Sequence, residues 1–182
     1  VWYVDPLDGT VKFAHGVPIF CVSLAYAEAG RVQLGGVYDP LRDECFCAER
    51  GKGAWLGEQR LQVTGVTQLI RSLLVTGFPY DVATNPRNNL AEYARLAVSS
   101  QGVRRLGSAA LDLCYLAAGR FDGYWELHLN SWDLAAGMLI ATEAGAHLER
   151  AWGMGDLLMP PCSVLACAPG IYTELRQALD HP

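Results

Sequence analysis

Two aspartates lie three positions apart near the start of the chain, in the segment V-D-P-L-D-G-T (Val4–Thr10). They follow an apolar run, Val1–Val4, which predicts a buried strand that ends at an acidic turn. Pro6 fixes its own φ and Gly9 frees the backbone, so both carboxylates are expected on the same side of this turn. Two carboxylates held so close repel each other unless a cation lies between them, and Mg2+ is a natural partner. The alternative is an ordinary acidic turn in which Asp8 caps a helix.

A third aspartate belongs to the segment S-W-D-L-A-A-G-M-L-I-A-T-E-A-G, residues 131–145. Asp133 is expected in the first turn of an apolar helix, where the helix dipole favours negative charge, so a simple N-terminal cap is the alternative. The small residues at 135–137 would let this helix approach another element closely. If Asp133 meets Asp5 and Asp8, the three carboxylates could hold one or two Mg2+ ions that bind a phosphate.

The elements that must position these residues change in character along the chain. Gly and Asp-Pro turns separate the apolar strands predicted at 19–28, 32–38 and 44–48, which indicates an antiparallel meander. Helices and strands alternate after residue 65. The strands are predicted at 72–77, 103–106, 120–127 and 163–168, and the helices at 88–99, from a Ser108 cap to 119, from Ser131 or Asp133 onward, and at 171–179. This pattern predicts an α+β protein with a seam near residues 65–72.

The composition limits the class of protein. The chain has 182 residues, of which 51% are hydrophobic and 18% charged, enough for one packed domain. A net charge of −5 opposes a general nucleic-acid surface. Neither a signal peptide nor an apolar run of about 18 residues is found, so we expect a cytoplasmic protein without a membrane partner. The six cysteines have no C-x-x-C pair or zinc-finger spacing, and buried thiols are expected.

Two long segments resemble the signatures of a known family. V-W-Y-V-D-P-L-D-G-T-V-K-F-A-H-G-V-P and W-D-L-A-A-G-M-L-I-A-T-E-A-G look like those of the inositol monophosphatase family, the Mg2+-dependent, lithium-sensitive phosphatases. The similarity continues through G-V-Y-D-P, G-K-G-A-W, T-G-F-P-Y, R-R-L-G-S-A-A-L-D-L and G-R-F-D-G-Y-W-E, and covers residues 1–145, more loosely the remainder. It implies a layered α/β/α/β/α sandwich of the inositol monophosphatase and fructose bisphosphatase type, and a homodimer. The chain would form a partial domain, with an antiparallel part (1–65) and an alternating part (66–182) that carry one metal motif each.

The resemblance also implies roles for individual residues. The metal ligands would be Asp5, Asp8, Asp133 and the Leu7 carbonyl; the phosphate would meet the backbone N–H groups of Gly9 and Thr10. The Thr10 hydroxyl would orient the attacking water, while Ala109, Glu126 and Asp133 would contact the substrate. The implied reaction is hydrolysis of a phosphate monoester by metal-activated water, without a covalent phospho-enzyme.

The sequence departs from the family at several positions. A Gly-Glu-Glu segment precedes the first motif in the family, and this chain contains no such segment. Because the chain also begins without Met and within a strand, we expect an N-terminally truncated piece that is weakly active or inactive alone. Lys12 stands where the family often has Asn, and Ala146 where a second Gly is common. His15 is expected to be structural, whereas His128, beside Glu126, could touch the substrate.

Rival interpretations remain. A haloacid-dehalogenase-type phosphatase also has Asp, Gly and Thr after its first strand, but its two aspartates are separated by one residue, and here they are separated by two. A truncated, non-catalytic binding or scaffold protein is a second alternative. The expected substrate is a small phosphorylated polyol, with inositol 1-phosphate favoured by F-A-H-G-V-P and G-V-Y-D-P. Histidinol phosphate, fructose bisphosphate and nucleotide 3′-phosphates are the alternatives within the family.

Overall fold

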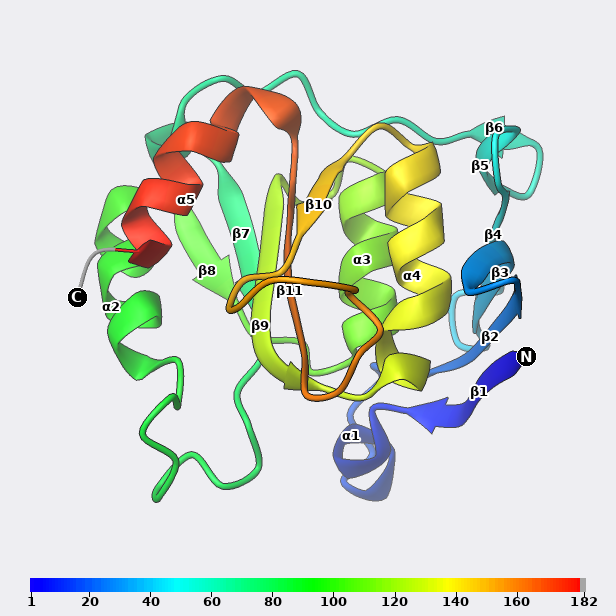
Figure 1. Cartoon of the computed structure of the whole chain (residues 1–182), viewed down its shortest axis with the longest axis horizontal. Helices are drawn as coiled ribbons and strands as arrows, with labels where there is room; N and C mark the ends of the chain where they lie inside the picture. The colour runs from blue at the N-terminus through cyan, green and yellow to red at the C-terminus, as the bar shows by residue number, and fades with distance from the viewer. Residues whose placement is uncertain (181–182) are drawn as a thin grey trace.

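The computed structural model describes residues 1–180, which form two β-sheets and two pairs of helices (Figure 1). The first sheet is an antiparallel meander whose strands follow chain order. Its strands are β1 (Trp2–Asp8), β2 (Cys21–Glu28), β3 (Arg31–Asp39), β4 (Glu44–Glu49), β5 (Gly53–Leu56) and β6 (Gln59–Arg60). The three strands predicted from the turn residues are therefore confirmed. The expectation of a buried first strand is wrong, because the exposed fraction is 59% for Trp2 and 50% for Val4.

The second sheet mixes parallel and antiparallel pairs in the order β10-β11-β9-β7-β8. Its strands are β7 (Leu73–Thr76), β8 (Gly102–Arg104), β9 (Gly123–Leu129), β10 (His147–Glu149) and β11 (Cys162–Cys167). β7 pairs in parallel with β8 and β9, while β11 is antiparallel to β9 and β10. Since an antiparallel meander is followed by alternating helices and strands, the predicted α+β class is confirmed.

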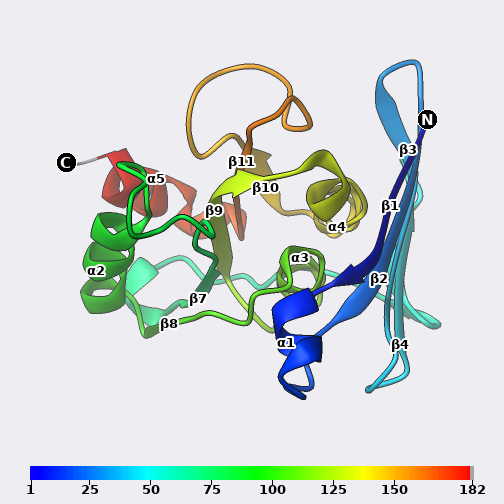
Figure 2. The ribbon, with the colours of Figure 1, turned by 90° about the horizontal axis from the view of Figure 1, so that it is seen from below.

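The helices divide the molecule into layers, which Figure 2 shows edge-on. α3 (Ala109–Ala117) and α4 (Ser131–Glu143) lie between the two sheets, and α2 (Leu90–Ser99) and α5 (Tyr172–Asp180) cover the far side of the second sheet. Short helices are α1 (Thr10–Ala14), η1 (Leu69–Arg71) and η2 (Pro169–Ile171). Four layers of the expected sandwich are thus present. Within residues 1–180 no helix covers the outer face of the first sheet, where Val22, Leu24, Leu34 and Tyr38 are exposed.

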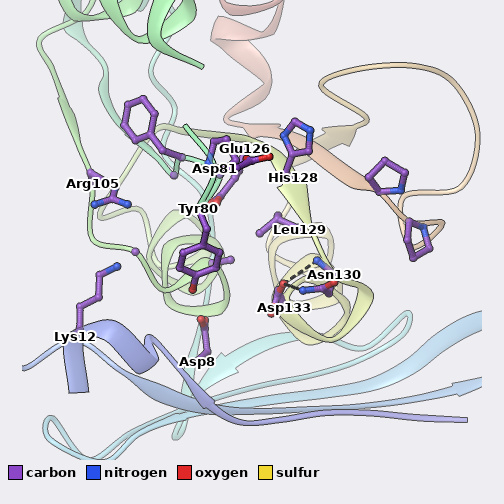
Figure 3. Close-up of a pocket in the computed structure, with 17 residues that line it drawn as sticks. Asp8, Lys12, Tyr80, Asp81, Arg105, Glu126, His128, Leu129, Asn130 and Asp133 are labelled. Atoms are coloured by element: carbon purple, nitrogen blue, oxygen red, sulfur yellow. Dashed lines mark hydrogen bonds between the residues drawn. The ribbon is translucent and has the colours of Figure 1, made fainter. Parts of the chain in front are cut away.

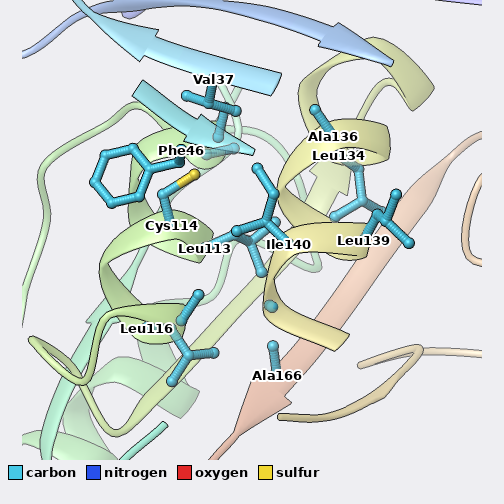
Figure 4. Packing of buried hydrophobic residues seen from close by; sticks show 14 of the residues in the cluster. Val37, Phe46, Leu113, Cys114, Leu116, Leu134, Ala136, Leu139, Ile140 and Ala166 are labelled. Atoms are coloured by element: carbon cyan, nitrogen blue, oxygen red, sulfur yellow. The ribbon is translucent and has the colours of Figure 1, made fainter. Parts of the chain in front are cut away.

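The central helix pair forms the main hydrophobic core (Figure 4). Every residue of α3 is buried, and α4 buries seven side chains or backbone positions. Phe46 from the first sheet meets these helices, and burial of such side chains stabilises the fold by about 1.5–3 kcal/mol each. None of the helices in the described part of the chain is both long and apolar enough to span a membrane.

Small residues allow α4 to lie close to its neighbours, as its sequence predicted. A Cβ atom added to Gly137 would lie 2.8 Å from Leu113 Cβ on α3. One added to Gly35 on β3 would lie 3.0 Å from the Ala136 carbonyl oxygen. Gly137 therefore sets how closely α4 approaches α3, and Gly35 how closely α4 approaches β3.

A matched pair of substitutions on β3 tests this close approach. Gly35→Ala is expected to lower the free energy of unfolding by about 1–3 kcal/mol, because the neighbouring helix backbone must move. Gly36→Ala places its methyl group in open space, with no atom within 4 Å, and is expected to change stability by about 0.5 kcal/mol or less. Urea denaturation followed by circular dichroism measures both. Equal effects of the two substitutions would show that the β3–α4 contact does not limit stability.

The cysteines divide into two groups. Cys21, Cys114, Cys162 and Cys167 are buried free thiols, as expected. Cys45 and Cys47 are exposed on β4, which corrects the expectation that all six thiols are buried. The reason is strand alternation: both side chains point to the uncovered outer face of the first sheet.

Candidate active site

Asp5 and Asp8 on β1 lie near Asp133, where the N-terminus of α4 approaches the end of β1. Asp5 and Asp8 flank an irregularity in the pairing of β1 with β2, and Asp133 lies in the first turn of α4. Burial raises the pKa of Asp133, and contact with Asp5 raises it further. The charges of Asp5 and Asp133 likewise add to the effect of burial on Asp8. The three carboxylates predicted to come together are therefore electrostatic neighbours.

Asp8 is buried and held by the start of α3. Its Oδ2 accepts hydrogen bonds from the Ser108 hydroxyl at 2.7 Å and from the Ala110 N–H at 2.9 Å. Ser108 is also the side-chain cap of α3, as its sequence context predicted, since its hydroxyl accepts from the Leu111 N–H. Burial raises the pKa of Asp8 from 3.8 to about 6, although these two hydrogen bonds oppose the shift. A negative charge here is costly without a nearby cation.

Asp133 is both a helix cap and a pocket residue, so the two interpretations of its sequence position are compatible. Its Oδ2 accepts hydrogen bonds from the Asn130 N–H at 2.7 Å and from Asn130 Nδ2 at 3.1 Å, which forms a capping box. Asp133 lines the pocket next to Asn130, to which the dashed lines of Figure 3 join it. The cap thereby fixes the orientation of the carboxylate.

The carboxylate oxygens of Asp5, Asp8 and Asp133 suit a divalent cation in part. Each carboxylate uses one oxygen to accept hydrogen bonds: Asp5 Oδ1 from the Leu7 N–H, and Asp8 and Asp133 through Oδ2. Across residues 1–180 the second oxygen of each accepts none from a backbone or side-chain donor. Hard divalent ions prefer such oxygens. Residues 1–180 nevertheless contain no group of three or more His, Cys, Asp or Glu side chains arranged to hold one metal ion, so these carboxylates offer an incomplete set.

The turn between β1 and α1 carries the other residues implied by the first motif. Gly9 has a φ of +90°, and a Cβ atom there would lie 2.7 Å from the Ile19 carbonyl oxygen, so a side chain would strain this turn. Thr10 is the first residue of α1, and its hydroxyl donates a hydrogen bond to the Leu7 carbonyl at 2.9 Å. The Leu7 carbonyl and Thr10 hydroxyl are therefore adjacent, although neither residue lines the pocket described next.

A pocket of about 600 Å³ opens beside Asp8 and Asp133 (Figure 3). This size is typical of small-molecule sites. Ala109 and Glu126 also line it, and the substrate contact that the resemblance implied for them stays a prediction. The other main lining residues, to which no role in the site was assigned from the sequence, are Lys12, Gly77, Phe78, Tyr80, Asp81, Arg105, Gly107 and Asn130. Lys12 had a signal as a departure from the family's usual Asn, and Gly77, Phe78, Tyr80, Arg105 and Gly107 lie in two segments that resemble the family, T-G-F-P-Y and R-R-L-G-S-A-A-L-D-L.

Glu126 presents its carboxylate to this pocket from β9. Gly77 makes room for it, because a Cβ atom at Gly77 would lie 2.1 Å from Glu126 Oε2. The Tyr124 hydroxyl donates a hydrogen bond to the same oxygen at 2.7 Å. Burial raises the pKa of Glu126 to about 7, while the hydrogen bond from Tyr124 opposes the shift. Near neutral pH the carboxyl group can thus either donate or accept a hydrogen bond.

The two histidines named from the sequence lie in different surroundings. His128 lines the pocket, with Nε2 at 3.5 Å from Asn85 Nδ2. Its Nδ1 is buried and has no hydrogen-bond partner among the described residues. Contact between His128 and a substrate stays a prediction. His15 is exposed at the end of α1 and lies outside the pocket lining.

Comparison with known proteins places this arrangement in a family. The sequence matches the inositol monophosphatase family over residues 1–180. It is 45% identical over 181 residues to an inositol-1-monophosphatase from Mesorhizobium japonicum, covering 100% of this chain and 68% of that protein. A Nus factor SuhB from Pasteurella multocida is 44% identical over 179 residues, which cover 98% of this chain and 67% of that protein.

A solved structure shows the same fold. The inositol monophosphatase from Anabaena (Nostoc) sp. PCC 7120 matches with a TM-score of 0.92 and 42% identity, covering 98% of this chain and 70% of that one. The chain thus spans about two thirds of the length of these relatives. On the grounds of sequence and fold together, the chain belongs to the inositol monophosphatase family.

Proposed function

We propose that the pocket hydrolyses a small phosphate monoester in a Mg2+-dependent reaction, with inositol 1-phosphate as the first candidate. The observation that carries this proposal is that Asp8 and Asp133 both line the pocket, while the negative charge of Asp5 acts on both of them. The name of the Mesorhizobium relative supports the substrate. A bound cation would offset the burial that raises the pKa values of Asp8 and Asp133, since it would favour their charged forms.

In this proposal Asp5, Asp8, Asp133 and the Leu7 carbonyl would provide ligands to bound Mg2+, with no single ion held by all three carboxylates as they are placed here. Bound Mg2+ would supply a Lewis acid that lowers the pKa of water and neutralises phosphoryl oxygens. The Thr10 hydroxyl orients the attacking water, and the backbone N–H groups of Gly9 and Thr10 hold the phosphate. The water attacks directly, so no covalent phospho-enzyme forms.

The rest of the pocket receives the leaving alcohol. Glu126 forms a hydrogen bond with a substrate hydroxyl, because its carboxyl group can donate or accept near neutral pH. Ala109, at the start of α3, leaves space for the ring. Such contacts set substrate choice, so histidinol phosphate, fructose bisphosphate and a nucleotide 3′-phosphate belong in the same assay.

Phosphate release from inositol 1-phosphate tests this function. We expect turnover with Mg2+, none with EDTA, and inhibition by Li+. Asp133→Asn provides the control against a contaminating phosphatase, since it should abolish the activity. Turnover that is indifferent to Mg2+ would contradict the proposal.

A non-catalytic binding protein is the second candidate. Its support is that relatives of similar identity carry the name Nus factor SuhB. This candidate predicts Mg2+ binding without turnover of any phosphate ester in the panel.

We also propose that the protein is a homodimer and lies in the cytoplasm. Light scattering after size-exclusion chromatography would test the first, and cell fractionation the second.

A further inference from the structure

Two cationic side chains line one wall of the pocket without an anionic partner. Lys12 comes from α1, and Arg105 from the loop between β8 and α3. Figure 3 shows both charged ends on the same side of the pocket, away from Asp133. Within residues 1–180 neither side chain makes a hydrogen bond or an ion pair. Arg105 lies over the ring of Phe78, at 5.6 Å from its centroid.

The two cations are close enough to affect each other. Burial lowers the pKa of Lys12, and the positive charge of Arg105 lowers it further. Gly107 makes room for the ammonium group, because a Cβ atom there would lie 1.7 Å from Lys12 Nζ. Asp8, Asp112 and Glu126 attract Lys12. None of these carboxylates forms an ion pair with Lys12, so Lys12 and Arg105 present two unpaired positive charges to the pocket.

We propose that Lys12 and Arg105 form a subsite for a second anionic group, a phosphate or carboxylate, carried by the leaving alcohol. The inference rests on the proposed function, which places the scissile phosphate at the aspartates. The guanidinium group offers paired N–H donors and the ammonium a point charge, which together suit a phosphate or carboxylate. The pocket would therefore bind bisphosphorylated sugars more tightly than the corresponding monophosphates.

Calorimetric titration with α-glucose 1-phosphate and α-glucose 1,6-bisphosphate tests the subsite, because both are pyranoses and the two ligands differ only in the second phosphate. The titrations are made with Mg2+ at low temperature, where turnover is slow. We expect the bisphosphate to bind about tenfold more tightly, as for one gained charge-assisted contact. Lys12→Asn and Arg105→Gln should each remove most of this preference and leave the affinity for the monophosphate unchanged. Arg104→Gln is the matched control, since Arg104 is exposed and lies outside the pocket lining.

Two outcomes would overturn the subsite. Equal loss of affinity for both ligands in Lys12→Asn and Arg105→Gln would place the two cations on the scissile phosphate instead. An unchanged preference would show that they bind no anion. Failure of the proposed function gives a different result: Asp133→Asn would leave the Mg2+ dependence of monophosphate binding unaltered, whatever Lys12 and Arg105 do.

Discussion

Replacing Asp8 with Asn is expected to reduce kcat/KM for Mg2+-dependent hydrolysis of inositol 1-phosphate by about 10²–10³-fold. The reason is that a metal ion contributes several kcal/mol of charge stabilisation, and each 1.36 kcal/mol is about tenfold in rate. The amide oxygen of Asn can still accept the hydrogen bonds from Ser108 and Ala110. The fold should therefore survive, and circular dichroism would confirm that it does.

The matched control for Asp8→Asn is Glu58→Gln, which removes one charge from the exposed β5–β6 turn. It should leave the rate unchanged. If the wild-type rate is too low for the full range, Mg2+ affinity measured by calorimetry gives the same comparison. Activity of Asp8→Asn within about threefold of wild type would exclude Asp8 as an essential ligand.

The metal-free protein is expected to lose stability as the pH rises from about 4 to 7, by about 3 kcal/mol from Asp8 alone. Asp8 titrates at about 6 in the folded chain, above its ordinary value of 3.8. The folded state therefore holds a proton that the unfolded state has lost across this interval. Its stabilising effect is complete below the unfolded pKa and is lost as the pH rises through the folded pKa. Glu126, raised to about 7, acts in the same direction.

Urea denaturation in EDTA at several pH values measures this dependence. Asp8→Asn should flatten the curve and make the metal-free protein more stable than wild type at pH 7. Saturating Mg2+ should stabilise the wild type most at the high-pH end, where the carboxylates are charged. A metal-free protein whose stability increases from pH 4.5 to 7 would contradict the assigned shifts.

Local patterns predicted most of the regular elements. β2, β3 and β4 follow from alternating apolar residues and clear turns, and α3 from the Ser108 cap. The short strands β5, β6 and β10 were missed, because two to four residues carry too little periodicity to be recognised. The exposure of β1 was missed for another reason. An apolar run is typical of a strand that packs against other residues, but it does not show that residues 1–180 supply that packing.

The candidate site was predictable where its residues form continuous motifs. Asp5, Asp8 and Asp133 stand out because acidic residues at the ends of apolar elements need an explanation. The cationic wall was not predictable, since Lys12 and Arg105 lie in separate segments and become neighbours only through tertiary contacts. Tyr80 belongs to the segment T-G-F-P-Y, whose resemblance to the family marked it as notable, but a loop without periodicity does not show that it faces the pocket.

The most direct test of the metal-site claim is anomalous diffraction from crystals of this chain grown with saturating Mn2+ as a substitute for Mg2+. We expect an anomalous peak beside the carboxylate oxygens of Asp8 and Asp133 in the wild type, and its loss in Asp8→Asn. The absence of a peak at Asp8 and Asp133 at saturating Mn2+, or a peak only at carboxylates outside this pocket, would contradict the proposed metal site.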